Sequence, residues 1–208
     1  MFSEIKIFAA GLASVIAIVA YIPYLIDMFR GKNRPHLYTW ISIVLVTTIV
    51  AYIQLIGGAG FGAIPTIVGD LIDIIILFYC FRFGTKDVVF TDKVCLAISV
   101  IGVLAYVIFR DLPAVSLAIV TAAEAISFIP TFRKTRNDPY SESLTSYYIV
   151  LLKLTLIIIA LQSYNLLTMS YSVTWITLYV IFLLSVYIWR SNRKNPKVHH
   201  ESSFPQTT

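Results

Sequence analysis

The sequence carries little charge for its length. Only 13% of its 208 residues are Asp, Glu, Lys or Arg, whereas 58% are hydrophobic. A soluble domain has about 25% charged residues, so this chain has too little polar surface to cover a globular fold in water. Because a helix of about 20 apolar residues spans the hydrocarbon core of a bilayer, the composition indicates an all-α polytopic membrane protein.

Residues and motifs of common enzyme and metal sites are also scarce. The two cysteines, Cys80 and Cys95, lie in or beside apolar runs, which argues against a disulfide framework. Of the three histidines, His199 and His200 fall in a polar tail and His36 in a basic loop. The chain has no HExxH, no GxSxG and no Gly-rich phosphate loop. We therefore expect no enzyme, no metal site and no cofactor.

Hydropathy predicts seven transmembrane helices. They cover residues 7–29, 37–56, 61–81, 94–109, 112–132, 144–161 and 167–189. Each run is continuously apolar, unlike the alternating strands of a membrane barrel. The first run is also longer than the apolar stretch of about 7–15 residues in a cleavable signal peptide.

The cations fall on one side of this topology. Of the 16 lysines and arginines, all but Lys6, Arg110 and Lys153 follow the first, third or fifth span or lie in the C-terminal tail. By the positive-inside rule we expect this side to be cytoplasmic, with the N-terminus outside, in a cell membrane. The net charge of +5 is then explained by the membrane, and no nucleic-acid partner is expected.

Two similar phrases place a proline at the same point of each half. "AYIPYLIDMFRGKNRPHLYTW" begins at Ala20 and "SFIPTFRKTRNDPYSESLTSY" at Ser127, and each runs from apolar residues into a basic loop. In each half a second span, a short external turn ("GGAG" or "SYN") and a third span follow. The fourth span reverses the chain, so we expect two parallel repeats related by an axis along the membrane normal. The expected units are a first three-helix repeat in 1–85, an inverting linker helix in 86–111, a second repeat in 112–190 and a disordered cytoplasmic tail in 191–208.

This layout of three, one and three spans, with Pro23 in "YIP" and Pro130 in "FIP", resembles the SWEET and PQ-loop superfamily of membrane transporters. The resemblance covers residues 7–190, although PQ-loop proteins carry Gln after the proline, where this chain has Tyr24 and Thr131. It implies alternating access, with the two prolines as hinges of an inner gate. Since a proline inside a helix removes a backbone hydrogen bond and bends it, the alternative is a static kink.

Four ionisable residues, Asp70, Asp73, Glu124 and Lys153, interrupt the apolar runs. At 1.5 Å per residue they lie about 12–18 Å from the outer ends of their spans, near the middle of a core of about 30 Å. Charged groups at that depth face a cavity or a partner, and transporter sites lie near the midplane between repeats. We predict that they bind a substrate or a coupling ion, either a proton or a monovalent cation. The alternative is a structural ion-pair network in which Lys153 neutralises an acid.

Spacing refines these expectations. Asp70 and Asp73 are three residues apart and share a helix face, so we expect one of them to hold a proton near neutral pH. Tyr21 and Trp175 lie deeper than the interfacial aromatic residues and are candidates for stacking on a sugar or a base, with packing or lipid contact as alternatives. Gln54, near the outer end of its span, is a candidate for lining an entrance.

The predicted function is transport of a small polar solute by alternating access, coupled to protons through the midplane carboxylates. The solute classes are sugars, nucleosides, amino acids and vitamins, and a homo-oligomer is allowed. Proton-coupled PQ-loop proteins such as the lysosomal cystine exporters use intramembrane aspartates. The resemblance implies a similar role for the midplane aspartates of this chain. The alternative is a pH-sensitive seven-helix receptor, because retrieval receptors of the secretory pathway are similar in fold.

Overall fold

The computed structural model describes residues 2–32, 35–84, 90–109, 112–140 and 144–192. In these ranges every regular element is a helix, so the predicted all-α class is confirmed there. The elements are α1 (Phe2–Phe29), α2 (Leu37–Ile56), the short 3-10 helix η1 (Gly60–Ala63), α3 (Ile64–Phe83), α4 (Phe90–Ile108), α5 (Pro113–Ser127), α6 (Ile129–Asn137), α7 (Leu144–Ala160) and α8 (Leu166–Asn192).

Four helical segments are long and apolar enough to cross a bilayer. They are Phe2–Phe29, Leu37–Ile56, Gly60–Phe83 and Leu166–Asn192. Shorter apolar stretches occupy Leu96–Ala105, Pro113–Ala122 and Leu144–Ala160. Large apolar side chains such as Phe8, Phe78 and Tyr187 lie largely exposed on the outside of the bundle, a surface that suits lipid and not water. The protein is therefore embedded in a membrane through apolar helices, and the full set of seven spans stays a prediction.

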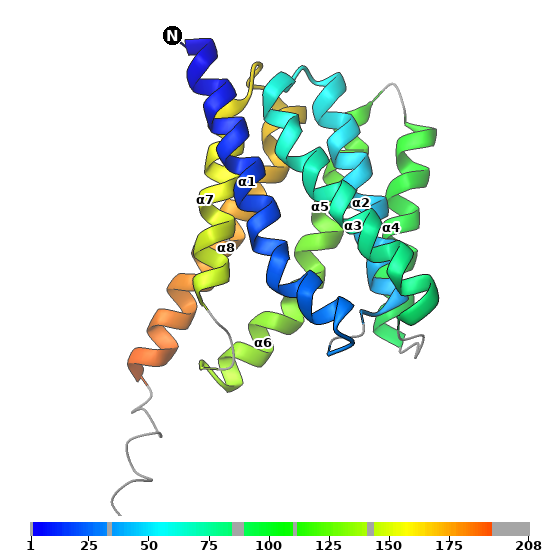
Figure 1. The fold of residues 1–208 in the computed structure, drawn as a ribbon, viewed down its shortest axis with the longest axis vertical. Helices are drawn as coiled ribbons and strands as arrows, with labels where there is room; N and C mark the ends of the chain where they lie inside the picture. The colour runs from blue at the N-terminus through cyan, green and yellow to red at the C-terminus, as the bar shows by residue number, and fades with distance from the viewer. Residues whose placement is uncertain (1, 33–34, 85–89, 110–111, 141–143, 193–208) are drawn as a thin grey trace, which may run out of the picture.

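The helices pack in a closed ring (Figure 1). In order around the ring, α1 packs on α3, α3 on α2, α2 on α4, α4 on α5, α5 on α8, α8 on α7, and α7 on α1. α2 also contacts α5 and α8 directly. The N-terminal helices therefore meet the C-terminal ones along two seams, one between α1 and α7 and the other where α2 approaches α5 and α8.

The seam between α1 and α7 depends on small side chains. Small residues allow two helix backbones to approach closely within a membrane, where dispersion replaces the hydrophobic effect as the main attraction. Ala13 packs in one buried cluster with Leu154 and Ile157 of α7, and neighbouring alanines of α1 pack against Ala160. The buried residues on this side of α1 are Ala9, Ala10, Ala13 and Ala17.

The predicted span 112–132 is not one continuous helix, and this corrects the sequence analysis. α5 ends at Ser127, and α6 leaves it at a clear angle (Figure 1). At the break, the Phe128 N–H donates to the Ala125 carbonyl at 3.2 Å, three residues back instead of four. Pro130 follows the break, and a proline has no N–H to donate to the preceding turn. By contrast, α1 continues through Pro23 as a single helix.

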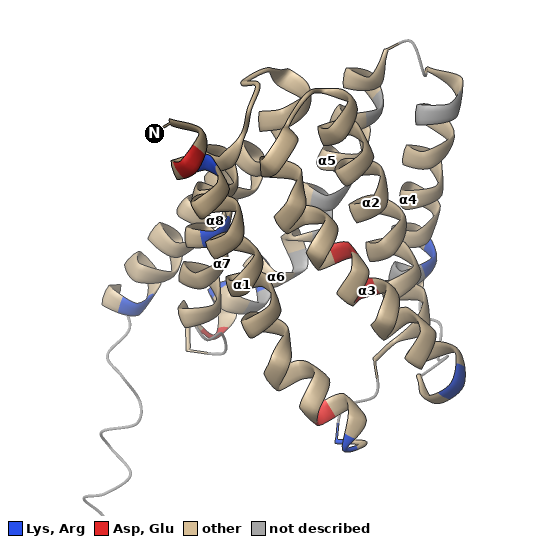
Figure 2. Ribbon diagram, turned by 45° about the horizontal axis from the view of Figure 1, so that its top comes forward, with Lys and Arg blue, Asp and Glu red and all other residues tan. Residues whose placement is uncertain are grey.

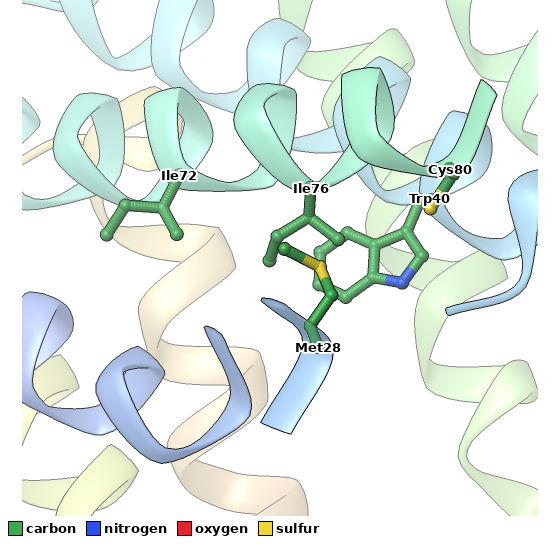
Figure 3. Close-up of a cluster of buried hydrophobic side chains, with 5 residues drawn as sticks. All are labelled: Met28, Trp40, Ile72, Ile76 and Cys80. Carbon is green, nitrogen blue, oxygen red and sulfur yellow. The ribbon is translucent and has the colours of Figure 1, made fainter. Parts of the chain in front are cut away.

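A buried cluster fixes the ends of the first three helices relative to one another (Figure 3). Met28 of α1 and Trp40 of α2 meet Ile72, Ile76 and Cys80 of α3. The Tyr79 hydroxyl also donates to the Met28 carbonyl at 2.8 Å. These contacts hold α1 against α3 one to two turns beyond the acidic residues of α3.

Most described cations gather at the end of the bundle where α1, α3 and α8 finish, which we call the cation-rich end (Figure 2). There the Arg190 side chain donates from Nε to the Pro139 carbonyl at 2.8 Å and lies over the Tyr140 ring. These contacts tie the end of α8 to the segment that follows α6. Lys6 lies at the opposite end and Lys153 within α7.

Candidate functional site

Asp73 is the most buried acidic residue among the described side chains, with 2% of its surface exposed. It lies in the middle of α3, and the Tyr21 hydroxyl of α1 donates to its Oδ1 at 2.6 Å. Because a buried carboxylate needs a donor or a cation to offset its lost hydration, Tyr21 is placed to stabilise it. The sequence did not indicate this hydrogen bond, and the predicted stacking of Tyr21 on a solute stays a prediction.

Asp70 faces a different neighbour. Its Oδ1 accepts hydrogen bonds from Thr47 at 2.7 Å and from Thr48 at 3.1 Å, and its Oδ2 accepts from Thr48 at 2.9 Å. Both threonines belong to α2, so Asp70 joins α3 to α2 while Asp73 joins α3 to α1. Two adjacent turns of one helix therefore connect all three N-terminal helices.

Lys153 brings a positive charge from the C-terminal half. It lies in α7, and the charge of Asp73 acts on it electrostatically. Lys153 makes no direct ion pair with Asp73 or Asp70 among the described side chains, unlike Lys32, whose Nζ lies 4.0 Å from Asp27 Oδ1. Figure 2 shows acidic positions on α3 and a basic one on α7 within the body of the bundle. Asp73 of α3 and Lys153 of α7 thus lie on two helices that both pack on α1.

Trp175 lies in α8 within a group of aromatic side chains. Its ring is 5.1 Å from that of Tyr179 and 5.8 Å from that of Phe128, which occupies the break between α5 and α6. It also packs on the cluster that contains Leu154, the residue after Lys153. Trp175 therefore contributes to packing around the break, and the predicted stacking on a solute stays a prediction.

Of the other predicted site residues, the structure describes the side chain of one and not those of two. Pro23 lies exposed within α1. Glu124 is part of α5 and Pro130 part of α6, but the side chains of both lie outside the described residues. The structure thus brings together Tyr21, Asp70 and Asp73, with Lys153 acting on the last of these.

At the end of the bundle opposite the cation-rich end, two turns are in direct contact. The Gln162 N–H donates to the Ala59 carbonyl at 2.9 Å, and the Asn165 side-chain amide donates to the Gly57 carbonyl at 2.7 Å. A Cβ atom on Gly62 would lie 2.9 Å from the Leu161 Cα atom, so only glycine fits there. We call this contact between residues 57–63 and 161–165 the turn contact.

Thr47 and Thr48 are site residues that the sequence analysis missed. Their signal was visible, because two adjacent hydroxyls interrupt the apolar phrase "VLVTTIVAY". Threonine in a membrane helix commonly bonds to a carbonyl of its own helix, as Thr47 does at 2.9 Å to Ile43. For that reason the pair did not by itself indicate a partner on another helix.

The chain matches no family model, no curated protein and no solved structure. The geometry of the buried residues is therefore the basis for a functional proposal.

Proposed function

We propose that this protein is a membrane transporter that moves a small polar solute by alternating access, with proton coupling at Asp73. The observation that carries the proposal is the position of Asp73, which is buried, bonded to Tyr21 of α1 and subject to the charge of Lys153 from α7. Ionisable groups are costly within a membrane and usually mark an ion or substrate pathway. The proposed solute classes are sugars, nucleosides, amino acids and vitamins.

The order of helix packing supports two parallel three-helix repeats. In the first half α3 packs between α1 and α2, and in the second half α8 packs between α5 and α7. The contact of α1 with α7 has a counterpart in the contact of α2 with α5, as expected for a two-fold axis along the membrane normal. We propose that α4, which packs on both α2 and α5, is the inverting linker of a SWEET-like or PQ-loop-like arrangement.

Asp73 is a better candidate for proton coupling than Asp70. Both oxygens of Asp70 accept threonine hydroxyls from one neighbouring helix, so its contacts need not change when the halves move. Asp73 interacts with Thr47 of α2 and also with α1 and α7, which meet at a seam between the halves. Protonating Asp73 removes its attraction for Lys153, so a proton would change the energy of that seam.

The proposed gates lie at the two ends of the bundle. We assign the cation-rich end to the cytoplasm by the positive-inside rule, and we propose that the turn contact is the outer gate. Two elements could open the inner end, namely the part of α1 beyond Pro23 and the short helix α6 after the break at Phe128. This arrangement supports Pro23 and Pro130 as hinges.

Transport is tested with the purified protein in proteoliposomes. A thermal-shift screen of sugars, nucleosides, amino acids and vitamins selects solutes, and uptake of the labelled solute is then measured with and without an imposed pH gradient. We expect accumulation driven by the gradient. Saturable binding without accumulation or exchange would instead support the pH-sensitive receptor, and neither binding nor uptake across the screen would refute both functions.

A further inference from the structure

Two fully buried polar side chains, Gln54 of α2 and Ser172 of α8, have no hydrogen-bond partner within the part of the chain that the structure describes. Both are 0% exposed, and the unpartnered atoms are the Gln54 amide oxygen and nitrogen and the Ser172 hydroxyl oxygen. Thr168, equally buried one turn from Ser172, donates its hydroxyl to the Ser163 carbonyl at 2.8 Å. Because leaving a buried polar group unpaired is costly, the unpartnered pair indicates a place for a ligand or for water.

Helix spacing puts the two residues at a similar depth on neighbouring helices. A Cβ atom on Gly57 would lie 3.1 Å from the Thr168 side chain, so Gly57 and Thr168 mark a point where α2 and α8 touch. Gln54 lies three residues before Gly57, about 4.5 Å deeper, and Ser172 lies four residues after Thr168, about 6 Å deeper. Residues three or four apart share a helix face. Spacing therefore puts both residues about one turn inside the turn contact, on two helices that contact each other.

This pair is also aligned with the acidic residues along α2. Gln54 follows Thr47 by seven residues, two helical turns, so it shares a face with Thr47 and lies about 10 Å farther out. Thr47 donates to Asp70. A solute that passes from the outer end to the acidic residues along this face of α2 meets Gln54 first.

We infer that Gln54 and Ser172 form a hydrogen-bonding subsite just inside the outer gate, which receives uncharged hydroxyl or amide groups of the solute when that gate opens. An amide and a hydroxyl both donate and accept hydrogen bonds, and neither carries charge. The neighbouring helix positions Val50, Ile53 and Leu117 form a buried apolar cluster, which would leave an ionic group uncompensated. The inference rests on the proposed transport function and specifies the chemistry of its solute.

Cysteine labelling tests the subsite without the need for a known solute. In a background with Cys80→Ala and Cys95→Ala, the variants Gln54→Cys and Ser172→Cys are reconstituted in proteoliposomes, so that each keeps the other member of the pair. Three methanethiosulfonate reagents are applied, one anionic, one cationic and one neutral with a hydroxyethyl group. Val173→Cys is the matched control, because this neighbour of Ser172 is 42% exposed on the outside of the bundle.

We expect the Gln54→Cys and Ser172→Cys thiols to react slowly while the turn contact is intact. Both should react several-fold faster when Asn165→Ala weakens the turn contact. Each reagent's rate is divided by its rate with a free thiol in water. On this scale the neutral hydroxyethyl reagent should react faster than either charged reagent. The charged reagents should not modify Val173→Cys, which faces lipid. Two results would overturn the inference: no modification even with Asn165→Ala in a protein that remains folded by gel filtration, or equal or faster modification by the charged reagents. Since labelling does not require uptake, a failure of the transport proposal would be seen separately.

Discussion

Tyr21 and Asp73, 52 positions apart in the chain, are joined by a 2.6 Å hydrogen bond between α1 and α3. The donor is a phenol, the acceptor is a buried carboxylate, and a lysine from α7 acts on the same carboxylate. Residues of α1, α3 and α7 are thus linked through one acidic side chain.

Asp73→Asn is expected to abolish the dependence of uptake on an imposed pH gradient while the protein stays folded. Asparagine keeps the size of the side chain and accepts a hydrogen bond from Tyr21, but it cannot take up a proton. Uptake in proteoliposomes with and without the gradient measures the effect, and gel filtration checks the fold. Asp70→Asn is the matched comparison and should remain coupled. Gradient-driven uptake by the Asp73 variant at the level of the unmodified protein would exclude Asp73 as the coupling residue.

Thr48→Val is expected to lower the free energy of unfolding by about 1–3 kcal/mol, because it removes a hydroxyl that donates to both Asp70 oxygens. Valine has nearly the same shape, so packing is preserved. Thr155→Val is the control, since Thr155 lies exposed on α7 and donates to the Leu151 carbonyl of its own helix. Denaturant unfolding in detergent compares the two. Equal stability of both variants would show that the Thr48 hydroxyl does not stabilise Asp70.

Tyr21→Phe tests whether the hydroxyl or the ring of this residue matters. If the hydrogen bond to Asp73 is essential, the phenylalanine variant should lose as much pH-driven uptake as Tyr21→Leu, because both lack the donor. If stacking on the solute is essential, only the leucine variant should fail. Tyr187→Phe, on the exposed face of α8, should transport normally. We expect the first outcome.

The effects of Asp73→Asn and Lys153→Met on stability are expected to be non-additive. Each single change leaves the opposite group without its electrostatic counterpart, whereas the double change removes both groups. The sum of the two single losses should therefore exceed the loss in the double variant, as a double-mutant cycle of unfolding free energies measures. Strict additivity would mean that the two groups act independently.

Gly62→Ala is expected to destabilise the protein and loosen the turn contact, because a Cβ atom there would lie 2.9 Å from the Leu161 Cα atom and 2.6 Å from its side chain. Backbone cannot yield as a flexible side chain does. Gly11→Ala is the control, since nothing lies within 4 Å of a Cβ atom at that position of α1, and alanine favours a helix by up to about 1 kcal/mol. Melting temperatures in detergent should fall for the first variant and not for the second.

Several features were predictable because they depend on local composition. Continuous apolar runs over residues 37–56 and 61–81 correspond closely to α2 and to η1 with α3. The buried position of Asp70 and Asp73 also followed from their place inside such a run. The break at Phe128 was not predicted, because the sequence analysis expected one span over residues 112–132. The two similar phrases also behave differently, since α1 passes through Pro23 unbroken while the segment near Pro130 divides into two helices.

The sequence by itself determined that the chain forms apolar membrane helices and that ionisable residues lie midway along them, because hydropathy and spacing along a helix are local properties. Only the tertiary structure decided that Asp73 meets Tyr21, that Asp70 meets Thr47 and Thr48, and that Gln54 and Ser172 lack a partner among the described residues. Each successive residue turns by about 100° around a helix axis, and neighbouring helices set the rotation of that axis. Partners between helices therefore depend on packing across the whole bundle.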